Sequence, residues 1–504
     1  MSDTNPSRQS PLEMTGGEFR VLGYDLVDRV ADFLDSLPQR SVTRDTTPNK
    51  LQQLLGGEKI PEQGKDPAQL LSETSSLLFE NSLFNGHPRF WGYITSSAAP
   101  IGALGDMLAA AVNPNVGAWD LSPMATEIET QTVRWIAELI GYPTDCGGVL
   151  SSGGNVANFI GFLAARADKA GWDIRTEGMY GGNSRQLRVY VSAETHTWIQ
   201  KAADLFGLGT DSVRWIPLDS KRRMDMSLLR RQIDKDKQAG DHPFMVVGTG
   251  GSVSTGVVDD LPAIAALCRE DDLWFHVDGA YGGFAASQFY GEGGAAVPPE
   301  LKGLSEADSI AVDPHKWLYA PLEAGCTLVR DPEKLRTAFE YHPAYYLFGE
   351  LAINYLDYGL QNSRGFRALK VWLALRQVGR QGYVQMIGDD IRLSEKMHEL
   401  VSAEAELEAF TQYLSISTFR FVPGDLKSGA EKVNDYLNKL NGEIVGRLQR
   451  EGEIFVSNAV VDDAFLLRAC IVNFRTTLED IRAMVEVVLR IGHEVDSSIR
   501  PKDL

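Results

Sequence analysis

Lys316 is the side chain whose place in the sequence most directly predicts covalent chemistry. It lies in the stretch 313–317, Asp-Pro-His-Lys-Trp, directly after a short apolar run at 307–312 that predicts a buried strand. Pro314 cannot continue a sheet ladder, so the chain must turn there and Lys316 falls just past the strand end. Ligands bind at that edge of open α/β sheets. A lysine partly removed from water there could present a neutral amine that forms a Schiff base, although a lone lysine after a turn is more often a surface residue.

A turn of small residues at 150–155, Leu-Ser-Ser-Gly-Gly-Asn, offers a second candidate site because it runs straight into a predicted helix at 155–170. Gly153 and Gly154 would let the backbone approach a ligand closely, and the helix start offers free N–H groups and a positive dipole end to an anion. The turn is neither Gly-x-Gly-x-x-Gly nor a Walker loop, which disfavours a dinucleotide or ATP. It predicts a phosphate cup that includes Asn155, although an ordinary helix N-cap has the same pattern.

Asp278 ends a continuous apolar run at 273–277, where a buried charge is costly unless it is paired. An aspartate there could hold a protonated ring nitrogen, which a pyridine cofactor requires to act as an electron sink. The glycines Gly279, Gly282 and Gly283 would leave room beside it for a flat group. The alternative is an aspartate that caps the next turn.

His196 follows a predicted strand at 188–192 and could stack on a cofactor ring, although most isolated histidines are structural. Taken together, the phosphate cup, His196, Asp278 and Lys316 fall in that order at the ends of predicted strands. If these strands share one sheet, the four features meet at one edge of it.

Alternating strands and helices must position these residues. Strands are predicted at 188–192, 213–217, 244–249, 273–277, 309–312 and 326–329. Helices are predicted at 100–112, 123–141, 155–170, 197–206, 225–239 and 261–271. The alternation predicts an α/β fold with a mostly parallel sheet flanked by helices.

The two ends of the chain have different patterns. The N-terminal part contains three predicted helices, at 17–37, 47–56 and 67–84, before any strand pattern. The C-terminal part alternates strands near 413–421, 454–460 and 465–474 with helices at 429–451 and 477–495. We therefore predict a helical arm at 1–90 that packs on a partner subunit, a large α/β domain at 91–380 and a small α+β domain at 381–504.

Composition limits the classes of function. The 504 residues are 43% hydrophobic and 23% charged, and the net charge of −19 argues against nucleic acid or an anionic membrane as a partner. The four cysteines are scattered, so no disulfide framework or metal site is predicted. No apolar stretch approaches a membrane span, and the N-terminus lacks an apolar signal core, which predicts a cytoplasmic protein.

At this point the chain resembles a known family, the pyridoxal-phosphate decarboxylases of the group that includes aromatic L-amino acid decarboxylase. The resemblance covers roughly residues 15–495. Its most specific pieces are 276–281, His-Val-Asp-Gly-Ala-Tyr, and 313–317, with Lys316 following Asp278 by 38 residues. The resemblance implies the fold-type-I architecture of pyridoxal-phosphate enzymes, a homodimer with sites at the subunit interface, and pyridoxal 5'-phosphate as cofactor.

The resemblance also implies roles for individual residues. Lys316 matches the lysine that binds the cofactor covalently, and Asp278 matches the partner of the pyridine nitrogen. Ala280 and His196 match the residues on the two faces of the ring. Tyr345 matches a tyrosine on a mobile loop that supports protonation of the substrate carbon after carbon dioxide leaves. The phosphate-binding set is Gly153, Gly154 and Asn155, with His315 and Ser252 as helpers.

Departures from the family pattern occur where substrate is chosen. Tyr93 and Ser96 match an aromatic and a hydroxyl residue of the family's substrate pocket. However, Ile94 and Gly117 stand where animal aromatic decarboxylases have phenylalanines. Ser363 stands where, in plant relatives, serine accompanies phenolic and glycine indolic substrates. The resemblance thus implies decarboxylation of an L-amino acid, with an aromatic one (tyrosine, DOPA, tryptophan or phenylalanine) as the leading substrate.

Three alternatives stay open. An acidic or diamino acid (glutamate, aspartate or 2,4-diaminobutyrate) is favoured if the pocket holds a charge partner for the side chain. An aromatic aldehyde synthase would oxidatively deaminate the same aromatic substrates. A nucleotide-binding or scaffolding module without covalent chemistry is the rival from another class, and the pair of Lys316 and Asp278 argues against it.

Overall fold

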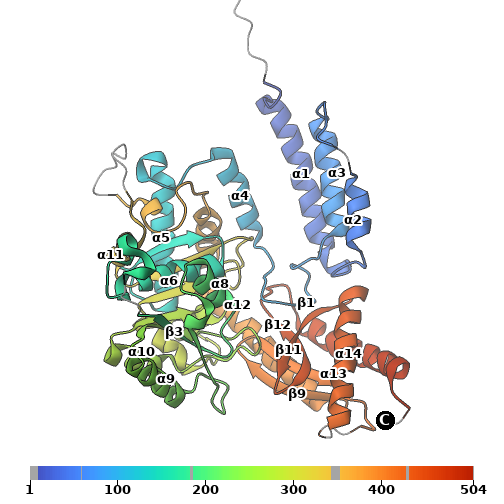
Figure 1. The fold of residues 1–504 in the computed structure, drawn as a ribbon. Helices are drawn as coiled ribbons and strands as arrows, with labels where there is room; N and C mark the ends of the chain where they lie inside the picture. Colours follow the sequence, from blue (N-terminus) through green and yellow to red (C-terminus); the bar gives the residue numbers. More distant parts are fainter. Residues whose placement is uncertain are drawn as a thin grey trace, which may run out of the picture.

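A seven-stranded sheet forms the centre of the larger part of the molecule in the computed structural model (Figure 1). The structure describes residues 10–57, 59–181, 185–341, 352–426, 429, 431–502 and 504. The strands are β2 (Gly147–Ser151), β3 (Leu187–Ser192), β4 (Val213–Ile216), β5 (His242–Thr249), β6 (Trp274–Asp278), β7 (Ser309–Val312) and β8 (Gly325–Val329). Their order is β2-β8-β7-β6-β5-β3-β4, in which β8 is antiparallel to both neighbours and the other pairs are parallel. The predicted mostly parallel sheet is confirmed. The edge strand β2 was not predicted, because it runs directly into the small residues of the predicted phosphate turn.

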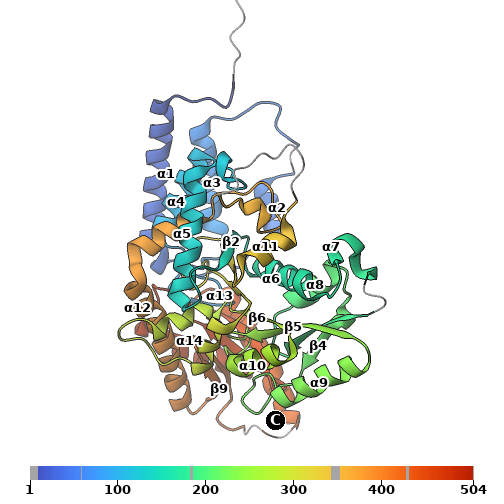
Figure 2. The ribbon, with the colours of Figure 1, turned by 90° about the vertical axis from the view of Figure 1, so that its left-hand side faces the viewer.

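Helices cover both faces of this sheet because alternate strand residues are apolar on both sides (Figure 2). On one face, Val189 and Met245 pack with α6 (Gly154–Lys169) and α8 (Trp198–Leu205). On the other face, residues such as Val246 belong to the core that includes three more helices. These are α5 (Pro123–Ile140), α9 (Met226–Gln238) and α10 (Leu261–Asp271). The shorter α7 (Ile174–Glu177) and α11 (Pro332–Phe339) lie at the periphery.

The C-terminal part contains a second sheet of five strands, in the order β1-β11-β12-β10-β9. The strands are β1 (Phe90–Trp91), β9 (Leu407–Tyr413), β10 (Ile416–Phe421), β11 (Phe455–Val461) and β12 (Ala464–Cys470), and α13 (Glu431–Glu451) and α14 (Leu478–Ile499) pack on them. The strand predicted at 413–421 is instead the turn and second strand of a hairpin, because Leu414 has a φ of 49° and reverses the chain. β1 reaches this sheet from the N-terminal region and pairs with β11 in parallel.

A long helix that the sequence pattern did not predict, α12 (Ala368–Ala403), joins the two sheets. Its helical dihedral angles are interrupted at Gly379, whose φ is 68°. The predicted domain boundary at 380 therefore falls at an interruption inside one helix, and the three domain ranges stay predictions.

Four N-terminal helices lead into the larger sheet: α1 (Gly16–Ser36), α2 (Pro48–Leu55), α3 (Pro67–Asn81) and α4 (Pro100–Val112). The first three form a group that projects from the body of the molecule (Figure 1). Within α1, which is described throughout, no residue is buried, although the helix carries apolar side chains such as Phe19 and Val27. No helix among the described residues is long and apolar enough to cross a membrane. The predicted cytoplasmic location stays a prediction.

Candidate active site

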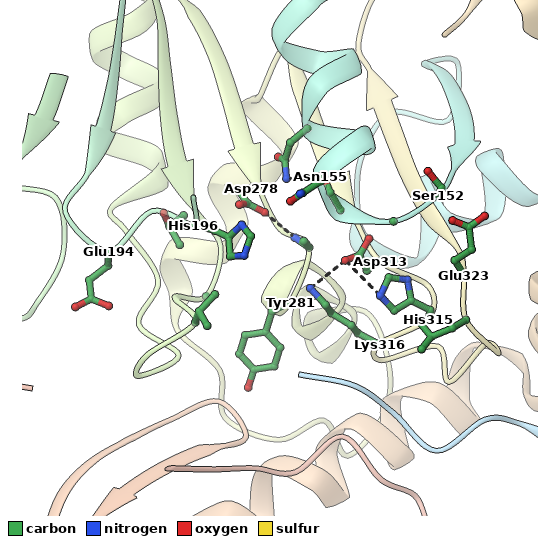
Figure 3. Close-up of a pocket in the computed structure, with 18 residues that line it drawn as sticks. Ser152, Asn155, Glu194, His196, Asp278, Tyr281, Asp313, His315, Lys316 and Glu323 are labelled. Carbon is green, nitrogen blue, oxygen red and sulfur yellow. Dashed lines mark hydrogen bonds and ion pairs between the residues drawn. The ribbon is translucent and has the colours of Figure 1, made fainter. Parts of the chain in front are cut away.

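A cavity of about 360 Å³ lies at the carboxyl ends of the parallel strands, where the sequence predicted a site (Figure 3). Eight of the predicted residues line it: Gly153, Gly154, Asn155, His196, Asp278, Ala280, His315 and Lys316. The ends of β2, β3, β6 and β7 bring them together, because the sheet order places these strands with the same direction. The predicted gathering of the four strand-end features is therefore present in the fold.

Lys316 lies on the turn after β7, where its Nζ atom is 2.9 Å from Oδ2 of Asp313. Asp313 is only 2% exposed, and the same Oδ2 atom is 3.7 Å from Nε2 of His315. Lys316 and Asp313 thus form an ion pair at the edge of the cavity, as Figure 3 shows. The pair gives the amine a proton acceptor at contact distance.

His315 is oriented by its own hydrogen bonding. Burial lowers the pKa of His315, which favours a neutral ring. Its Nδ1 atom is 2.6 Å from the carbonyl oxygen of Ala324, so a ring that donates there leaves Nε2 as an acceptor on the side of Asp313. The Ser96 hydroxyl also donates to the His315 carbonyl oxygen at 2.7 Å, which ties the N-terminal segment to the turn before Lys316.

Asp278 closes the opposite side of the cavity and is almost fully buried. The Trp198 indole donates to Oδ2 at 2.8 Å, and the backbone N–H of Ala280 donates to Oδ1 at 3.2 Å. These two neutral donors fix the carboxylate without neutralising it. The arrangement suits an anion that must pair with a cationic group of a ligand.

Behind Asp278, a buried network keeps a second histidine uncharged. His276 lies between Ser309 Oγ and Asn158 Oδ1, each 2.7 Å from a ring nitrogen. Burial lowers the pKa of His276 to about 4, so the ring is neutral at physiological pH. Asn158, which also lines the cavity, donates to the Gly154 carbonyl oxygen at 2.9 Å. The network therefore links β6 and β7 to the first turn of α6.

The small residues of the predicted phosphate cup are required by close contacts. Gly153 has a φ of 99°, a conformation that side chains rarely adopt. A Cβ on Gly154 would lie 2.7 Å from Asp313 Oδ2, and one on Gly325 would lie 2.6 Å from the Gly153 backbone. The free N–H groups of the α6 start therefore remain open to the cavity, as an anion site requires.

His196 stands at the mouth of the cavity, after β3, and its ring points toward Asp278 in Figure 3. Burial is the largest influence on His196 and lowers its pKa, while the Asp278 charge acts in the opposite direction. Trp198 donates its backbone N–H to His196 Nδ1 at 3.3 Å. A neutral, oriented imidazole can contact one face of a planar group, and Ala280 lines the same cavity.

Two of the glycines after Asp278 serve internal packing rather than ligand binding. A Cβ on Gly282 would lie 2.1 Å from the Gly250 carbonyl oxygen, and one on Gly283 would lie 2.7 Å from Val312. These glycines therefore permit packing of the protein on itself, and the expectation that they leave room for a ligand is wrong.

Ser252 lies near the cavity but is not among the residues that line it, although its neighbour Gly251 is. It is buried, and its hydroxyl is 2.9 Å from the Thr255 hydroxyl. The predicted support of the phosphate by Ser252 therefore stays a prediction.

The residues predicted to choose substrate lie outside the cavity lined by this chain. Tyr93 is 56% exposed, and its backbone is held by Ser457 and Arg468 of the C-terminal sheet. Ile94 is buried in the main core, and Ser96 contacts the turn before Lys316 as described above. These three described residues do not line the cavity, and Ser96 reaches it through the His315 carbonyl oxygen.

Gly117 and Ser363 lie in two segments that approach each other closely. A Cβ on Gly117 would be 2.2 Å from the backbone oxygen of Asn362, so a larger residue such as phenylalanine would require the neighbouring segment to shift. Ser363, next along the chain, is exposed. Tyr345 lies outside the described residues.

Several cavity residues had not been assigned a role from the sequence: Ser152, Asn158, Glu194, Thr249, Gly251, Val253, Tyr281, Asp313, Leu322 and Glu323. Asp313 carried a usable signal, since it precedes Lys316 by three residues on a turn. The Trp198 hydrogen bond to Asp278 carried none, because the two residues are 80 positions apart.

The geometry fits one class of protein: an enzyme that binds a phosphorylated pyridine aldehyde, with Lys316 as the side chain that could bond to it. The residues fit that group, because the glycine cradle at the start of α6 is open to an anion. Asp278 is a buried carboxylate that could pair with a ring N–H, and the amine of Lys316 faces the same cavity. Among the described residues, no group of His, Cys, Asp and Glu is arranged to hold a metal ion.

Comparisons with known proteins identify the family. The pyridoxal-dependent decarboxylase conserved domain matches residues 48–420. The chain is 32% identical over 492 residues to an aromatic-L-amino-acid decarboxylase of Bacillus atrophaeus, with 97% of this chain and 98% of the relative covered. It is 30% identical to a histidine decarboxylase of Drosophila melanogaster, covering 92% of this chain and 54% of that protein. It is 28% identical to a phenylacetaldehyde synthase of Petunia hybrida, covering 90% and 89%.

A solved structure agrees with this family. The crystal structure of Oryza sativa TDC with PLP and tryptamine superimposes with a TM-score of 0.87 at 26% identity, covering 97% of this chain and 99% of that chain. The chain belongs to the family of pyridoxal-dependent decarboxylases. It is an amino acid carboxy-lyase whose cofactor is pyridoxal 5'-phosphate.

Proposed function

We propose that this decarboxylase acts on an aromatic L-amino acid (tyrosine, DOPA, tryptophan or phenylalanine) and releases the amine and carbon dioxide. The observation that carries the proposal is the 32% identity over 97% of this chain to an aromatic-L-amino-acid decarboxylase, and the charge of the cavity is in keeping with it. Among its described lining residues, Lys316 is the one lysine or arginine, and it is committed to the cofactor. An acidic substrate side chain would therefore meet carboxylates and no free cation there.

We assign roles to the cavity residues as part of this proposal. Lys316 binds the cofactor aldehyde, and Gly153, Gly154 and Asn155 hold the phosphate with the start of α6. When bound, the cofactor supplies an electron sink for the electron pair left by carbon dioxide. Asp278 holds a proton on the ring nitrogen, and that proton keeps the sink effective.

Further residues orient the cofactor and substrate. His196 and Ala280 contact the two faces of the ring, and His315 and Ser252 support the phosphate end. Tyr345 delivers a proton to the substrate α-carbon and so favours amine over aldehyde. Tyr93, Ile94, Ser96, Gly117 and Ser363 shape the substrate side of the site in the assembled enzyme.

A second candidate is a substrate with a cationic side chain, such as a diamino acid. The observation that favours it is Glu194, which lines the cavity and has a buried Oε2 atom without a hydrogen-bond partner among the described residues. Glu323 also lines the cavity, but it forms an ion pair with Arg367 at 2.7 Å and is therefore less able to bind a cationic substrate side chain. An aldehyde synthase is the third candidate, since a phenylacetaldehyde synthase is a relative at 28% identity.

One screen separates these candidates. The holoenzyme is incubated with the common L-amino acids, with DOPA and with 2,4-diaminobutyrate, and amine, carbon dioxide, aldehyde and peroxide are followed together. We expect equal amine and carbon dioxide from an aromatic substrate without oxygen consumption. Turnover confined to diamino acids or glutamate would contradict the aromatic proposal, and peroxide with aldehyde would replace it by the synthase.

We further propose that the enzyme is a homodimer built on its N-terminal helices. The helix α1 buries none of its residues within the chain, and Leu108 and Val112 of α4 are also exposed. Apolar surface of this extent on consecutive helices is typical of an interface. Analytical sedimentation at assay concentration should give a dimer, and removal of residues 1–85 should yield insoluble or inactive protein. A fully active monomer would contradict the proposal.

A further inference from the structure

Asp313 has a property that ion pairing with Lys316 does not explain. One of its oxygens, Oδ2, is 2.9 Å from Nζ of Lys316 and 3.7 Å from Nε2 of His315, whereas Oδ1 is buried and has no hydrogen-bond partner among the described residues. A buried carboxylate oxygen without a partner is costly, so its persistence at a functional site calls for a use. In Figure 3 the carboxyl group stands between the amine and the imidazole.

The position of Asp313 explains why a carboxylate can remain there. Its Oδ2 lies where a Cβ on Gly154, the first residue of α6, would be only 2.7 Å away. The positive end of the helix dipole thus faces the anion. Two other titratable side chains are influenced by the Asp313 charge, His196 after β3 and Cys326 on β8. Burial keeps the thiol of Cys326 protonated by raising its pKa, so it does not compete for the lysine proton.

We infer that Asp313 is the acid–base group that serves Lys316 when the lysine bonds to the cofactor aldehyde. The inference rests on the proposed role of Lys316. An ammonium cannot attack a carbonyl carbon, so Asp313 first takes one proton from Nζ. The nitrogen–carbon bond then forms, and the carbon–oxygen bond of the carbonyl breaks. Asp313 returns its proton to that oxygen, a second proton passes to it from the lysine nitrogen, and the oxygen leaves as water. The carboxylate is restored, and the three protons of the ammonium end as one on the linking nitrogen and two in the water.

His315 is the alternative base, but its geometry is less suitable. Its Nε2 is 3.7 Å from Asp313 Oδ2, and the carboxyl group stands between the imidazole and the Lys316 amine (Figure 3). Asp313 is at 2.9 Å from Nζ and lies three residues before the lysine on the same rigid turn. Contact distance to the proton is the first requirement of a general base, and Asp313 meets it.

The test compares Asp313→Asn with the native enzyme after the cofactor has been removed and pyridoxal 5'-phosphate is added back. Stopped-flow absorbance measures how fast the coloured lysine adduct forms, and borohydride reduction with peptide mass spectrometry locates it. Pyridoxamine 5'-phosphate has no aldehyde and cannot bond to the lysine, so its binding shows whether the phosphate-binding turn is intact. The matched control is Asp236→Asn, which removes another buried, ion-paired carboxylate, on α9.

We expect Asp313→Asn to bind pyridoxamine 5'-phosphate as the native protein does but to form the adduct about 10²-fold more slowly or worse. Its rate should recover toward the native rate as pH rises, because solvent then removes the proton. A native rate of adduct formation would overturn the inference, and so would an equal loss of pyridoxamine 5'-phosphate binding, which would make Asp313 a structural residue. A native adduct on a lysine other than Lys316 would instead overturn the proposed function itself.

Discussion

The cofactor side and the substrate side of this site are built differently. On the cofactor side, Asp278, Asp313 and Lys316 end or follow neighbouring strands, are mostly buried and are held by hydrogen bonds within one chain. On the substrate side, Tyr93 and Ser363 are exposed and do not line the cavity of this chain. Within the described chain, the residues proposed for the cofactor share one cavity, and those proposed for the substrate do not.

The difference follows from what fixes the positions of the residues on each side. Strand ends are fixed by the sheet, so the chemistry-bearing residues need only the correct spacing along the chain. The substrate-side residues lie on connections and beside exposed apolar helices, so their final surroundings depend on a second subunit in the proposed dimer. A substitution on the cofactor side should therefore change the rate for every substrate, whereas one on the substrate side should change the choice among substrates.

The largest expected effect is that of Asp278→Asn, which keeps the size of the side chain and removes its charge. Without the charge, the ring nitrogen loses its proton and the electron sink weakens, which costs several kcal/mol, or on the order of 10³-fold in kcat. The loss should be the same for all accepted substrates, as measured by steady-state kinetics on three of them. Near-normal turnover would show that the strand-end carboxylate is structural only.

A smaller and more selective effect is expected from Gly117→Ala. The new Cβ would meet the Asn362 backbone oxygen at 2.2 Å, so the neighbouring segment must shift, at a cost of roughly 1–3 kcal/mol in stability. Cofactor absorbance and labelling of Lys316 should be retained, while the ratio of kcat/KM between two aromatic substrates changes. Gly365→Ala is the control, because a Cβ there has nothing within 4 Å. An equal loss of kcat/KM for every substrate would contradict the proposed difference between the cofactor side and the substrate side.

The sequence could supply some of these residues and not others. The positions of Lys316 and Asp278 were predictable because an apolar run followed by Pro314 or by a carboxylate marks a strand end locally. The partners of Asp278 were not, since Trp198 reaches it only when β3 and β6 are placed in one sheet. The helix α12 was missed because its 36 residues are interrupted at Gly379 and are buried on more than one side, which hides the helical period.

The last expected effect is on stability rather than on turnover, and it concerns Asp390 of α12, which lies behind the turn that carries Lys316. Its Oδ2 accepts hydrogen bonds from Trp317 Nε1 at 3.0 Å and from the Tyr319 hydroxyl at 2.7 Å. Complete burial raises the pKa of Asp390 to about 7. Because an unfolded aspartate has a pKa of about 3.9, the folded state binds the proton more tightly, and this group makes stability fall as pH rises from about 4 to about 7. Above that range its contribution is constant.

Asp390→Asn removes this titration and keeps the size of the side chain. The urea midpoint of the variant, relative to the native enzyme, should therefore move upward as pH increases from 5 to 7 and then stay level. His276 acts in the opposite direction in both proteins, since its lowered pKa makes stability fall as pH drops below about 6.5, so only the difference between the two curves isolates Asp390. Asp389→Asn removes a half-exposed neighbour whose charge helps to raise the pKa of Asp390, so in that variant the fall of stability should end at a lower pH than in the native enzyme. Parallel curves for Asp390→Asn and the native enzyme would mean that the carboxyl group does not titrate in this range, and that the Lys316 turn is held by an ordinary ionised hydrogen-bond acceptor.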